Sequence, residues 1–312
     1  MTGGAGFVGV PVVARFLQLG AEVHVIDNFV RGSRSRLEGL GRGSAPTVHE
    51  ADIRDRDRLV AIFEAIAPDV VVHLAAHHFI PFCEAHPAEA LEVNILGTQR
   101  ILDVSARVGL QRFVFASTAD VYRPAVTPHT ETDPVDPVGV YGLSKFLGES
   151  LVRHAVCGAR GIAHAVVARL FNIFGPGETN PHLIPEIFDQ LSQGDVLRLG
   201  NMSTRRDYVW VGDVAHALVA LSQRDVPDGE VLTVNVGSGV SASAAEIVEI
   251  LSRLSGRMIT VESDAARMRR VDRPNLQAAS DLLQTLCPDV IETSLEQGLG
   301  RLLVQKPSPI AR

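Results

Sequence analysis

A glycine-rich segment close to the start of the chain constrains the fold more than any other feature. The segment Thr2-Gly3-Gly4-Ala5-Gly6-Phe7-Val8-Gly9 contains two overlapping patterns, Gly-x-Gly-x-x-Gly and Gly-x-x-Gly-x-x-Gly. Glycines at this spacing permit a tight turn, let the backbone approach a pyrophosphate and allow the following helix to pack closely. The segment therefore predicts a dinucleotide-binding βαβ unit. Its cofactor contacts are expected from Gly3, Gly6, Phe7 and Val8.

An acidic residue follows at the distance that such a unit requires. The run Glu22–Ile26 is typical of a strand, and Asp27 comes directly after it. A carboxylate at this point would accept hydrogen bonds from the adenosine ribose and repel a 2′-phosphate, so it favours NAD over NADP. Arg31 and Arg34 follow closely, so NADP stays an alternative cofactor. Asn28 is a further candidate contact of the cofactor. The alternative is a glycine-rich turn followed by an exposed aspartate.

Short β-rich runs alternate with helical patterns through the first half of the chain. This alternation predicts right-handed βαβ crossovers, and hence an α/β fold of the Rossmann type with a doubly wound parallel sheet. The runs expected as strands are Glu22–Ile26, Thr47–Ala51, Asp69–Ala75 and Arg112–Ser117.

The residues before the glycine loop are too few for the strand that this fold needs there. Only Met1 and Thr2 precede Gly3. The first strand is therefore expected to be truncated, or else the native chain starts upstream. Pro11 is also expected to crowd the turn before it in the helix that follows the loop.

A tyrosine and a lysine are candidates for the chemistry. Tyr141 and Lys145 are four residues apart, so they would project side by side from a helix. A phenol has a reference pKa of about 10, and a neighbouring ammonium favours the phenolate and lowers that pKa. The spacing alone is weak, because it also occurs in helices where the tyrosine packs and the lysine is solvated.

Composition excludes several classes of function. The 312 residues carry 36 acidic and 29 basic side chains and a formal net charge of −7, which argues against nucleic-acid binding. No apolar run approaches the ~20 residues of a membrane span. Cys83, Cys157 and Cys287 have no paired spacing, which indicates reduced thiols in a cytosolic protein rather than disulfides or a metal site.

With the glycine loop, Asp27 and the pair Tyr141/Lys145, the chain resembles the extended short-chain dehydrogenase/reductase family. The resemblance is to its NAD-dependent nucleotide-sugar epimerase/dehydratase branch, of the UDP-glucose 4-epimerase kind, and it covers nearly the whole chain. The further motifs that carry it are Ala51-Asp52-Ile53, Val72-His73-Leu74-Ala75-Ala76, Asn94-Ile95-Leu96-Gly97-Thr98, Ser117-Thr118-Ala119-Asp120-Val121-Tyr122, Arg169 to Pro176 and Arg206 to Asp213.

The resemblance implies roles for individual residues. Tyr141 matches the catalytic base, Lys145 the residue that holds the nicotinamide ribose, and Thr118 the hydroxyl beside the reacting oxygen of the sugar. Further cofactor contacts are implied for Asp52, Ile53, Leu74, Ala75 and Ala76. The residues implied to bind the nucleotide sugar are Asn172, Arg206 and Arg269, with Arg270 nearly as good a candidate as Arg269. In the alternative interpretation, Asn172 only forms a turn and the arginines form a solvated basic face. No metal is implied.

The implied activity is a 4-epimerase that acts on a UDP-hexose or UDP-hexuronate through a transient 4-keto sugar. A 4,6-dehydratase of the family has Asp-Glu after the threonine, whereas this chain has Ala119-Asp120. Dehydration is therefore disfavoured, while Asp120 leaves decarboxylase-like chemistry open. A 4-ketoreductase would use the same tyrosine and lysine, and a non-catalytic NAD(P)-sensing protein would need only the cofactor site, so both remain open.

The resemblance also implies how the chain is divided and assembled. Residues 1–171 are expected to form the NAD-binding domain, with 207–236 returning to it. Residues 172–206 and 237–312 are expected to form the substrate-binding region. A homodimer is implied, formed through helices around Ala88–Val108 and Tyr141–Cys157.

Overall fold

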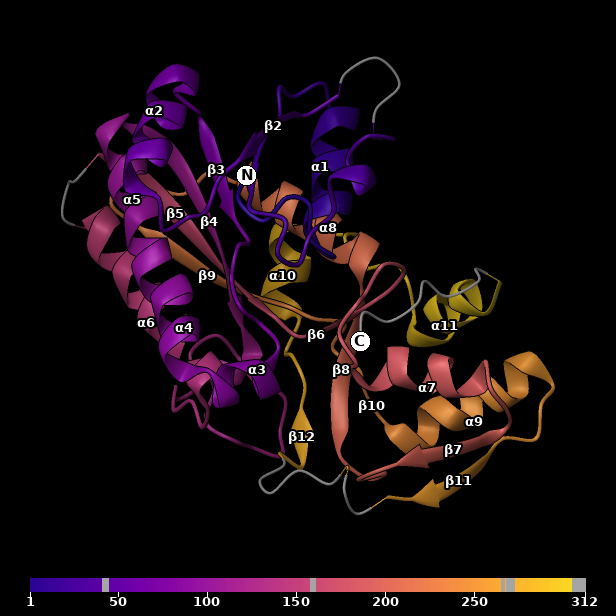
Figure 1. Ribbon diagram of the computed structural model, residues 1–312. Helices are drawn as coiled ribbons and strands as arrows, with labels where there is room; N and C mark the ends of the chain where they lie inside the picture. The colour runs from indigo at the N-terminus through magenta and orange to yellow at the C-terminus, as the bar shows by residue number, and fades with distance from the viewer. Residues whose placement is uncertain (41–44, 158–160, 265–266, 268–272, 305–312) are drawn as a thin grey trace.

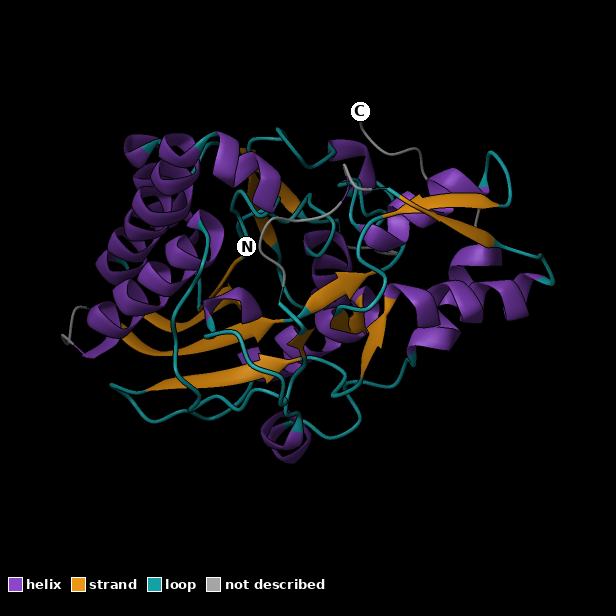
Figure 2. Ribbon diagram, turned by 90° about the horizontal axis from the view of Figure 1, so that it is seen from below, coloured by secondary structure: helices purple, strands orange, loops and turns teal. Residues whose placement is uncertain are grey.

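The computed structural model describes residues 1–40, 45–157, 161–264, 267 and 273–304. Two regions lie side by side (Figure 1). The larger is a parallel sheet covered by helices on both faces, and the smaller is built mainly from the second half of the chain. Figure 2 shows the same two regions from below, with one stack of helices along a side of the strands of the larger region.

The sheet of the larger region is parallel throughout. Its strands are β1 (His24–Asp27), β2 (Thr47–Glu50), β3 (Val70–His73), β4 (Leu110–Thr118), β5 (Ile162–Leu170) and β9 (Val231–Val236). Strands β3, β4, β5 and β9 pair in that order, and β1 pairs with β2. The four strands predicted from the sequence are all present, with ends that differ by about two residues or fewer. The Rossmann-type fold class is thereby confirmed.

The first two residues join the two parts of this sheet. Thr2 bridges in parallel to Ile26 of β1 and to His73 of β3. Its amide donates to the Val72 carbonyl at 3.0 Å, and the Ile26 amide donates to the Met1 carbonyl at 2.8 Å. Met1 and Thr2 thus lie where the strand before the glycine loop is expected, and they make its backbone hydrogen bonds over two residues.

Helices cover both faces because successive strand residues point to opposite sides. Val72 packs under α1 (Gly9–Gln18) and α8 (Val211–Ser222), whereas its neighbour Val71 packs on the opposite face. The helices of that second face are α2 (Arg56–Ile66), α5 (Thr98–Arg107) and α6 (Val140–Cys157), and α5 continues from α4 (Pro87–Leu91) through a π-helical turn, η2 (Glu92–Gly97). The shorter α3 (Ile80–Ala85) and α10 (Asp281–Leu286) complete this region.

Pro11 lies in the first turn of α1. It is the third residue of the helix, which begins at Gly9. The first four amides of a helix have no intrahelical partner, so the missing N–H costs nothing there. A turn with a helical hydrogen bond precedes Pro11, since Val10 N donates to Gly6 O at 3.1 Å, so the crowding expected there stays a prediction.

The smaller region is organised on β8 (Arg205–Trp210). This strand pairs with β6 (Asn172–Phe174), β10 (Ser241–Ser243) and β12 (Asn275–Leu276). Around it lie α7 (Leu183–Leu191), α9 (Ala244–Ser255), α11 (Leu295–Val304) and the parallel pair β7 (Val196–Leu199) and β11 (Thr260–Ser263). Residues 207–210 belong to β8. Tyr208 and Trp210 are buried in the core of the smaller region, whereas Val209 packs into the core of the larger one, and α8 follows directly.

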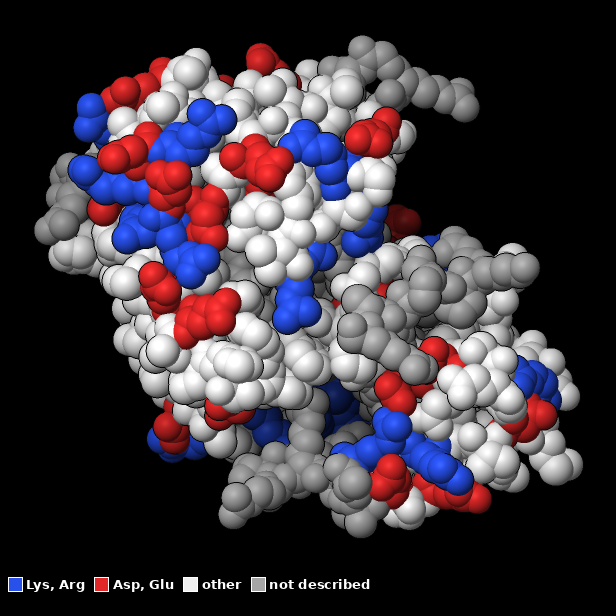
Figure 3. All heavy atoms as spheres, in the orientation of Figure 1, with Lys and Arg blue, Asp and Glu red and all other residues white. Residues whose placement is uncertain are grey.

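Acidic and basic side chains are interspersed on the outer surface of the larger region (Figure 3). Ion pairs such as Arg107–Glu64 and Arg54–Glu92 account for part of this pattern. Among the helices in the described part of the chain, none combines the length and the apolar character needed to cross a membrane.

Candidate active site

A cavity of about 1120 Å³ lies between the two regions, where β1, β3 and β4 end. Ligands of open α/β sheets bind at this edge, because the loops that follow the strands meet there. The site residues expected from the sequence that line this one cavity are Gly3, Gly6, Phe7, Val8, Asp27, Asn28, Asp52, Ile53, Leu74, Ala75, Ala76, Thr118, Tyr141, Lys145, Asn172 and Arg206. Arg269 and its alternative Arg270 lie outside the described residues.

The glycine loop is packed too tightly for side chains. Gly3 has a φ of 69°, and a Cβ there would lie 2.7 Å from the Ala75 amide nitrogen. A Cβ on Gly9 would lie 2.7 Å from the Gly4 carbonyl carbon. At Gly6, by contrast, a Cβ would meet only the Gly3 oxygen, at 3.3 Å, so its open side faces the cavity that it lines. The loop therefore presents bare backbone, and the amides that open α1, to a ligand.

Asp27 is held in place by backbone amides. Its Oδ2 accepts from Ala5 N at 3.0 Å, and its Oδ1 accepts from Phe29 N at 2.9 Å. Each carboxylate oxygen keeps a second lone pair for a ligand. Nearby, the Arg34 guanidinium pairs with Glu50 at 2.9 Å and lies over the Phe29 ring, so it is engaged away from Asp27.

The loop after β2 forms a second polar contact at the same end of the cavity. Asp52 accepts hydrogen bonds from Asn28 Nδ2 at 2.9 Å and from Arg54 Nε at 2.9 Å. These bonds, chiefly those from Arg54, hold the pKa of Asp52 well below its usual range. Ile53 is buried and packs against Gly97, where a Cβ would lie 2.5 Å from the Ile53 Cδ1.

Tyr141 and Lys145 lie one turn apart at the start of α6, as their spacing predicts. The Tyr141 side chain lies beside the Thr118 side chain at the end of β4, and both line the cavity. Lys145 Nζ donates to the Ala116 carbonyl at 2.8 Å and lies 4.9 Å from the centre of the Phe115 ring. Thr118, Tyr141 and Lys145 therefore meet at one point of the cavity wall.

The acid–base properties of this pair differ from the expectation. Burial raises the pKa of Tyr141 above its ordinary value and the charge of Asp120 raises it further, while the contact with Thr118 acts in the opposite direction. Burial lowers the pKa of Lys145 to about 8. The expectation that Lys145 lowers the pKa of Tyr141 is wrong for the protein chain alone, because desolvation dominates and the ammonium is directed at Ala116.

A buried amide joins the cavity wall to the catalytic helix. Asn94, in the π-helical turn η2, accepts from His77 N at 2.8 Å and donates to His77 O at 2.8 Å. Its Nδ2 also donates to Ser144 Oγ at 2.9 Å, and Ser144 Oγ donates to the Tyr141 carbonyl at 2.7 Å. Asn94 thus fixes the segment after β3 to the first turn of α6.

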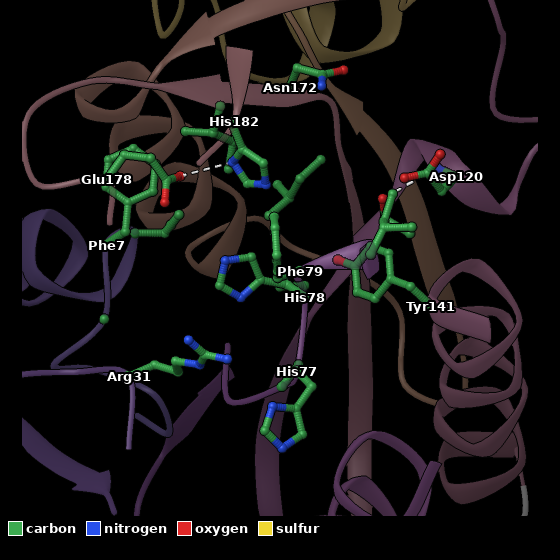
Figure 4. Close-up of a pocket in the computed structure, with 18 of the residues that line it drawn as sticks. Phe7, Arg31, His77, His78, Phe79, Asp120, Tyr141, Asn172, Glu178 and His182 are labelled. Atoms are coloured by element: carbon green, nitrogen blue, oxygen red, sulfur yellow. Dashed lines mark hydrogen bonds and ion pairs between the residues drawn. The ribbon is translucent and has the colours of Figure 1, made fainter. Parts of the chain in front are cut away.

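Three polar side chains lie across the cavity from Tyr141, namely His78, Glu178 and His182 (Figure 4), and Asn180 contacts two of them. Glu178 is 7% exposed and pairs with His182 at 3.4 Å. Asn180 Nδ2 lies 3.2 Å from Glu178 Oε1 and 2.9 Å from His78 Nε2. Although burial would raise the pKa of Glu178, its contacts with His182, Asn180 and His78 keep it below its ordinary value. These residues come from loops without periodicity, so the sequence offered no signal beyond their residue types.

Two arginines approach the site from the smaller region and the C-terminal segment. Arg206, on β8, donates from Nη1 to the carbonyls of Arg205 at 2.8 Å and Arg273 at 2.9 Å. Arg273, which the sequence did not single out, lines the cavity beside Asp120. Asn172 opens β6 between these arginines and the end of the main sheet.

The comparisons with known proteins define the class. The family model described as "NAD dependent epimerase/dehydratase family" matches residues 1–237, and the chain belongs to that family. It is 32% identical over 304 residues to a UDP-glucose 4-epimerase of Halalkalibacterium halodurans, covering 92% of this chain and 88% of the relative. It is 30% identical to a GDP-6-deoxy-D-mannose reductase of Pseudomonas aeruginosa, covering 83% of this chain and 86% of that relative.

Solved structures of the same family have the same fold. A UDP-glucose 4-epimerase from Stenotrophomonas maltophila, with bound NAD and formylated UDP-arabinopyranose, matches with a TM-score of 0.87 and 27% identity, covering 96% of this chain and 94% of that one. A UDP-glucose 4-epimerase from Thermotoga maritima with UDP-glucose matches with a TM-score of 0.84 and 27% identity, covering 98% and 96%. The family predicted from the sequence is confirmed.

Proposed function

We propose that this chain is an NAD-dependent nucleotide-sugar 4-epimerase that acts on a UDP-hexose or a UDP-hexuronate through a transient 4-keto sugar. The observation that carries the proposal is that Thr118, Tyr141 and Lys145 line the same cavity that the glycine loop opens into. The similarity to UDP-glucose 4-epimerases over most of the chain supports it.

The residues present fit NAD. A backbone cradle at Gly3, Gly6 and Gly9 that side chains would block suits a pyrophosphate, and the opening amides of α1 suit its charge. Asp27 has acceptor capacity left for the adenosine ribose, and it disfavours a 2′-phosphate. Phe7, Val8, Asn28, Asp52, Ile53, Leu74, Ala75 and Ala76 are proposed as the further cofactor contacts, with Lys145 at the nicotinamide ribose.

We further propose a division of labour along the chain. Residues 1–171, with α8 and β9, would hold the cofactor, and the remaining parts of 172–312 would hold the nucleotide sugar. Asn172, Arg206 and Arg269 are proposed as substrate contacts. Guanidinium groups suit a diphosphate because their planar donors match phosphate oxygens, and they offset the net charge of −7.

The catalytic residues would act on the 4-hydroxyl of the sugar. Thr118 orients the hydroxyl, Tyr141 accepts its proton, and the same proton returns when the alcohol is re-formed on the other face. When bound, NAD supplies the acceptor for the hydrogen on C4 and a positive charge that favours the Tyr141 phenolate. Lys145 donates to Ala116 O at 2.8 Å, which fixes its ammonium in the same cavity wall.

A 4-ketoreductase is the second candidate, because one relative at 30% identity is a GDP-6-deoxy-D-mannose reductase. The same tyrosine and lysine would serve it. The two activities differ in stoichiometry, since an epimerase consumes no reduced cofactor overall, whereas a reductase consumes one equivalent for each product formed.

A homodimer is also proposed. Leu143 and Leu147 lie one turn apart on α6 and are 42% and 38% exposed, and Leu96 on η2 is 52% exposed. A second copy packed on these helices would bury them. Light scattering should then give twice the chain mass of 33.5 kDa, and a single mass would contradict the dimer.

The three cysteines support a cytoplasmic location, which we propose as well. Cys83, Cys157 and Cys287 are all unpaired, as expected in a reducing compartment. Cell fractionation in which the protein appears outside the cytoplasm would refute this location.

The deciding experiment measures products and cofactor together. The protein is incubated with UDP-glucose, UDP-glucuronate, UDP-N-acetylglucosamine and dTDP-glucose, with and without NAD, and the products are separated by chromatography. Conversion of a substrate to its 4-epimer without net change in NADH absorbance supports the proposal. If no compound is interconverted, the epimerase assignment fails. Stoichiometric oxidation of added NADH or NADPH in a parallel assay with a 4-keto nucleotide sugar would replace it with the reductase.

A further inference from the structure

Arg31 is a cation in the cavity lining to which the proposed function gives no task. It lies in the loop after β1, shortly beyond Asp27, and it lines the same cavity as Gly6 of the glycine loop. In the part of the chain that the structure describes, no carboxylate pairs with Arg31, whereas the nearby Arg34 pairs with Glu50 at 2.9 Å. The guanidinium of Arg31 is therefore available to an anionic ligand.

The backbone that carries Arg31 is held against the glycine loop. Ser33 N donates to the Ala5 carbonyl at 3.2 Å, and a Cβ on Gly32 would lie 2.7 Å from the Ala5 Cβ. Only a glycine at position 32 allows the two loops to approach so closely. Arg31 is thus anchored directly beside the backbone cradle that suits a pyrophosphate, and its long side chain starts within reach of that cradle.

The side chain of Arg31 extends from its loop toward the opposite side of the cavity, where His77 and His78 follow β3 (Figure 4). Its Cζ lies over the ring of Phe82 in α3, 5.5 Å from the ring centre. Burial lowers the pKa of His77, and the charge of Arg31 contributes in the same direction. A guanidinium that lies over a ring keeps its N–H donors, which are in its own plane, for other acceptors.

We propose that Arg31 is a latch on the bound cofactor. Its guanidinium, supported by Phe82, donates hydrogen bonds to the pyrophosphate that the glycine loop holds, and it thereby slows the release of NAD. Planar donors match phosphate oxygens, and the positive charge offsets the charge of the pyrophosphate. This inference rests on the proposed function and deepens it, because an epimerase must keep its reduced cofactor while the keto sugar turns, whereas a ketoreductase exchanges the cofactor in every turnover.

The test measures release of the cofactor and needs no sugar substrate. The unaltered protein, Arg31→Gln and Arg34→Gln are each loaded with NADH, an excess of NAD is added, and the decay of NADH fluorescence gives the dissociation rate. Arg34→Gln is a matched control, because it removes the same charge from the same loop. The Arg34 guanidinium pairs with Glu50 and lies outside the cavity lining.

We expect Arg31→Gln to release NADH at least about tenfold faster than the unaltered protein, because it loses charge-assisted hydrogen bonds to phosphate. Arg34→Gln should stay within about twofold of the unaltered protein, since it breaks only an exposed ion pair. Arg31→Lys keeps the charge without the planar fork and should give an intermediate rate. An unchanged rate in Arg31→Gln, or an equal acceleration in Arg34→Gln, overturns the inference.

A series of ligands identifies the phosphate that Arg31 contacts. Calorimetry is carried out with NAD, ADP-ribose and NADP on the unaltered protein and on Arg31→Gln. A pyrophosphate contact predicts that the variant loses affinity for NAD and ADP-ribose by the same factor, because both compounds carry the pyrophosphate and only one carries nicotinamide. A loss confined to NADP would assign Arg31 to a 2′-phosphate and overturn the latch alone. If the unaltered protein binds none of the three, the proposed function fails and the inference fails with it.

Discussion

The two regions of this molecule are built on different principles. In the larger region, β4 and β5 are nine-residue parallel strands whose partners follow one another along the chain through helices. In the smaller region, β8 pairs with three segments of only two or three residues, drawn from positions between 172 and 276. The first arrangement is repetitive and deeply buried, and the second is assembled from distant pieces. We infer that the larger region fixes the chemistry and the smaller one adapts to the substrate.

The strongest test of this contrast removes the phenol. Tyr141→Phe should lower kcat by about 10²–10⁴-fold, because the transfer of the 4-hydroxyl proton loses its acceptor, while NAD binding is kept. Arg206→Met in the smaller region should instead act mainly on KM. Steady-state rates and fluorescence titration with NAD measure both effects. A comparable loss of kcat in the two variants would show that the chemistry is not confined to the larger region.

Ion pairs should show the same contrast in stability. Arg169 and Glu149 in the larger region are 3% and 2% exposed and form two hydrogen bonds of 2.9 and 2.8 Å. Arg169→Met leaves the Glu149 charge buried, so the free energy of unfolding should fall by about 3–5 kcal/mol in urea titrations. Glu296→Gln breaks the exposed pair with Arg253 in the smaller region and should change nothing measurable. Equal losses of unfolding free energy in Arg169→Met and Glu296→Gln would contradict the contrast between the two regions.

The smallest expected effects come from alanine substitutions at two glycines, one in each region. A Cβ on Gly9 would overlap the backbone of Gly3 and Gly4, whereas a Cβ on Gly194, between α7 and β7, would have no neighbour within 4 Å. Gly9→Ala should therefore lower stability by about 1–3 kcal/mol and weaken NAD binding. Gly194→Ala should leave the melting temperature the same or slightly higher. If Gly9→Ala melts like the unaltered protein, the glycine loop is less constrained than its packing indicates.

The contrast also explains what the sequence could predict. Strand runs such as Asp69–Ala75 carry a local pattern, so β3 and its neighbours were located within a few residues. The pair Tyr141/Lys145 was predictable because four residues make one helical turn. The raised pKa of Tyr141 was not, because it depends on burial and on Asp120, which reach it through the packing of β4 against α6.

The residues proposed to contact the substrate could be predicted only from their residue types and motifs. Asn172 and Arg206 came from motif resemblance, and both line the cavity. Glu178, Asn180 and His78 form one hydrogen-bonded group, although His78 is 102 residues from Asn180 in the chain. No spacing rule connects such positions, because the contact exists only once β6 and β8 have brought the two regions together.

The clamp formed by Asn94 has a mechanical consequence. The amide holds both backbone groups of His77 and, through Ser144, the carbonyl of Tyr141, so the wall of the cavity and the helix that carries the phenol are a single rigid frame. We therefore expect a displacement of one to be passed to the other. In the proposed epimerisation, a ketone that turns its opposite face to Tyr141 would have to do so beside this hydrogen-bonded frame.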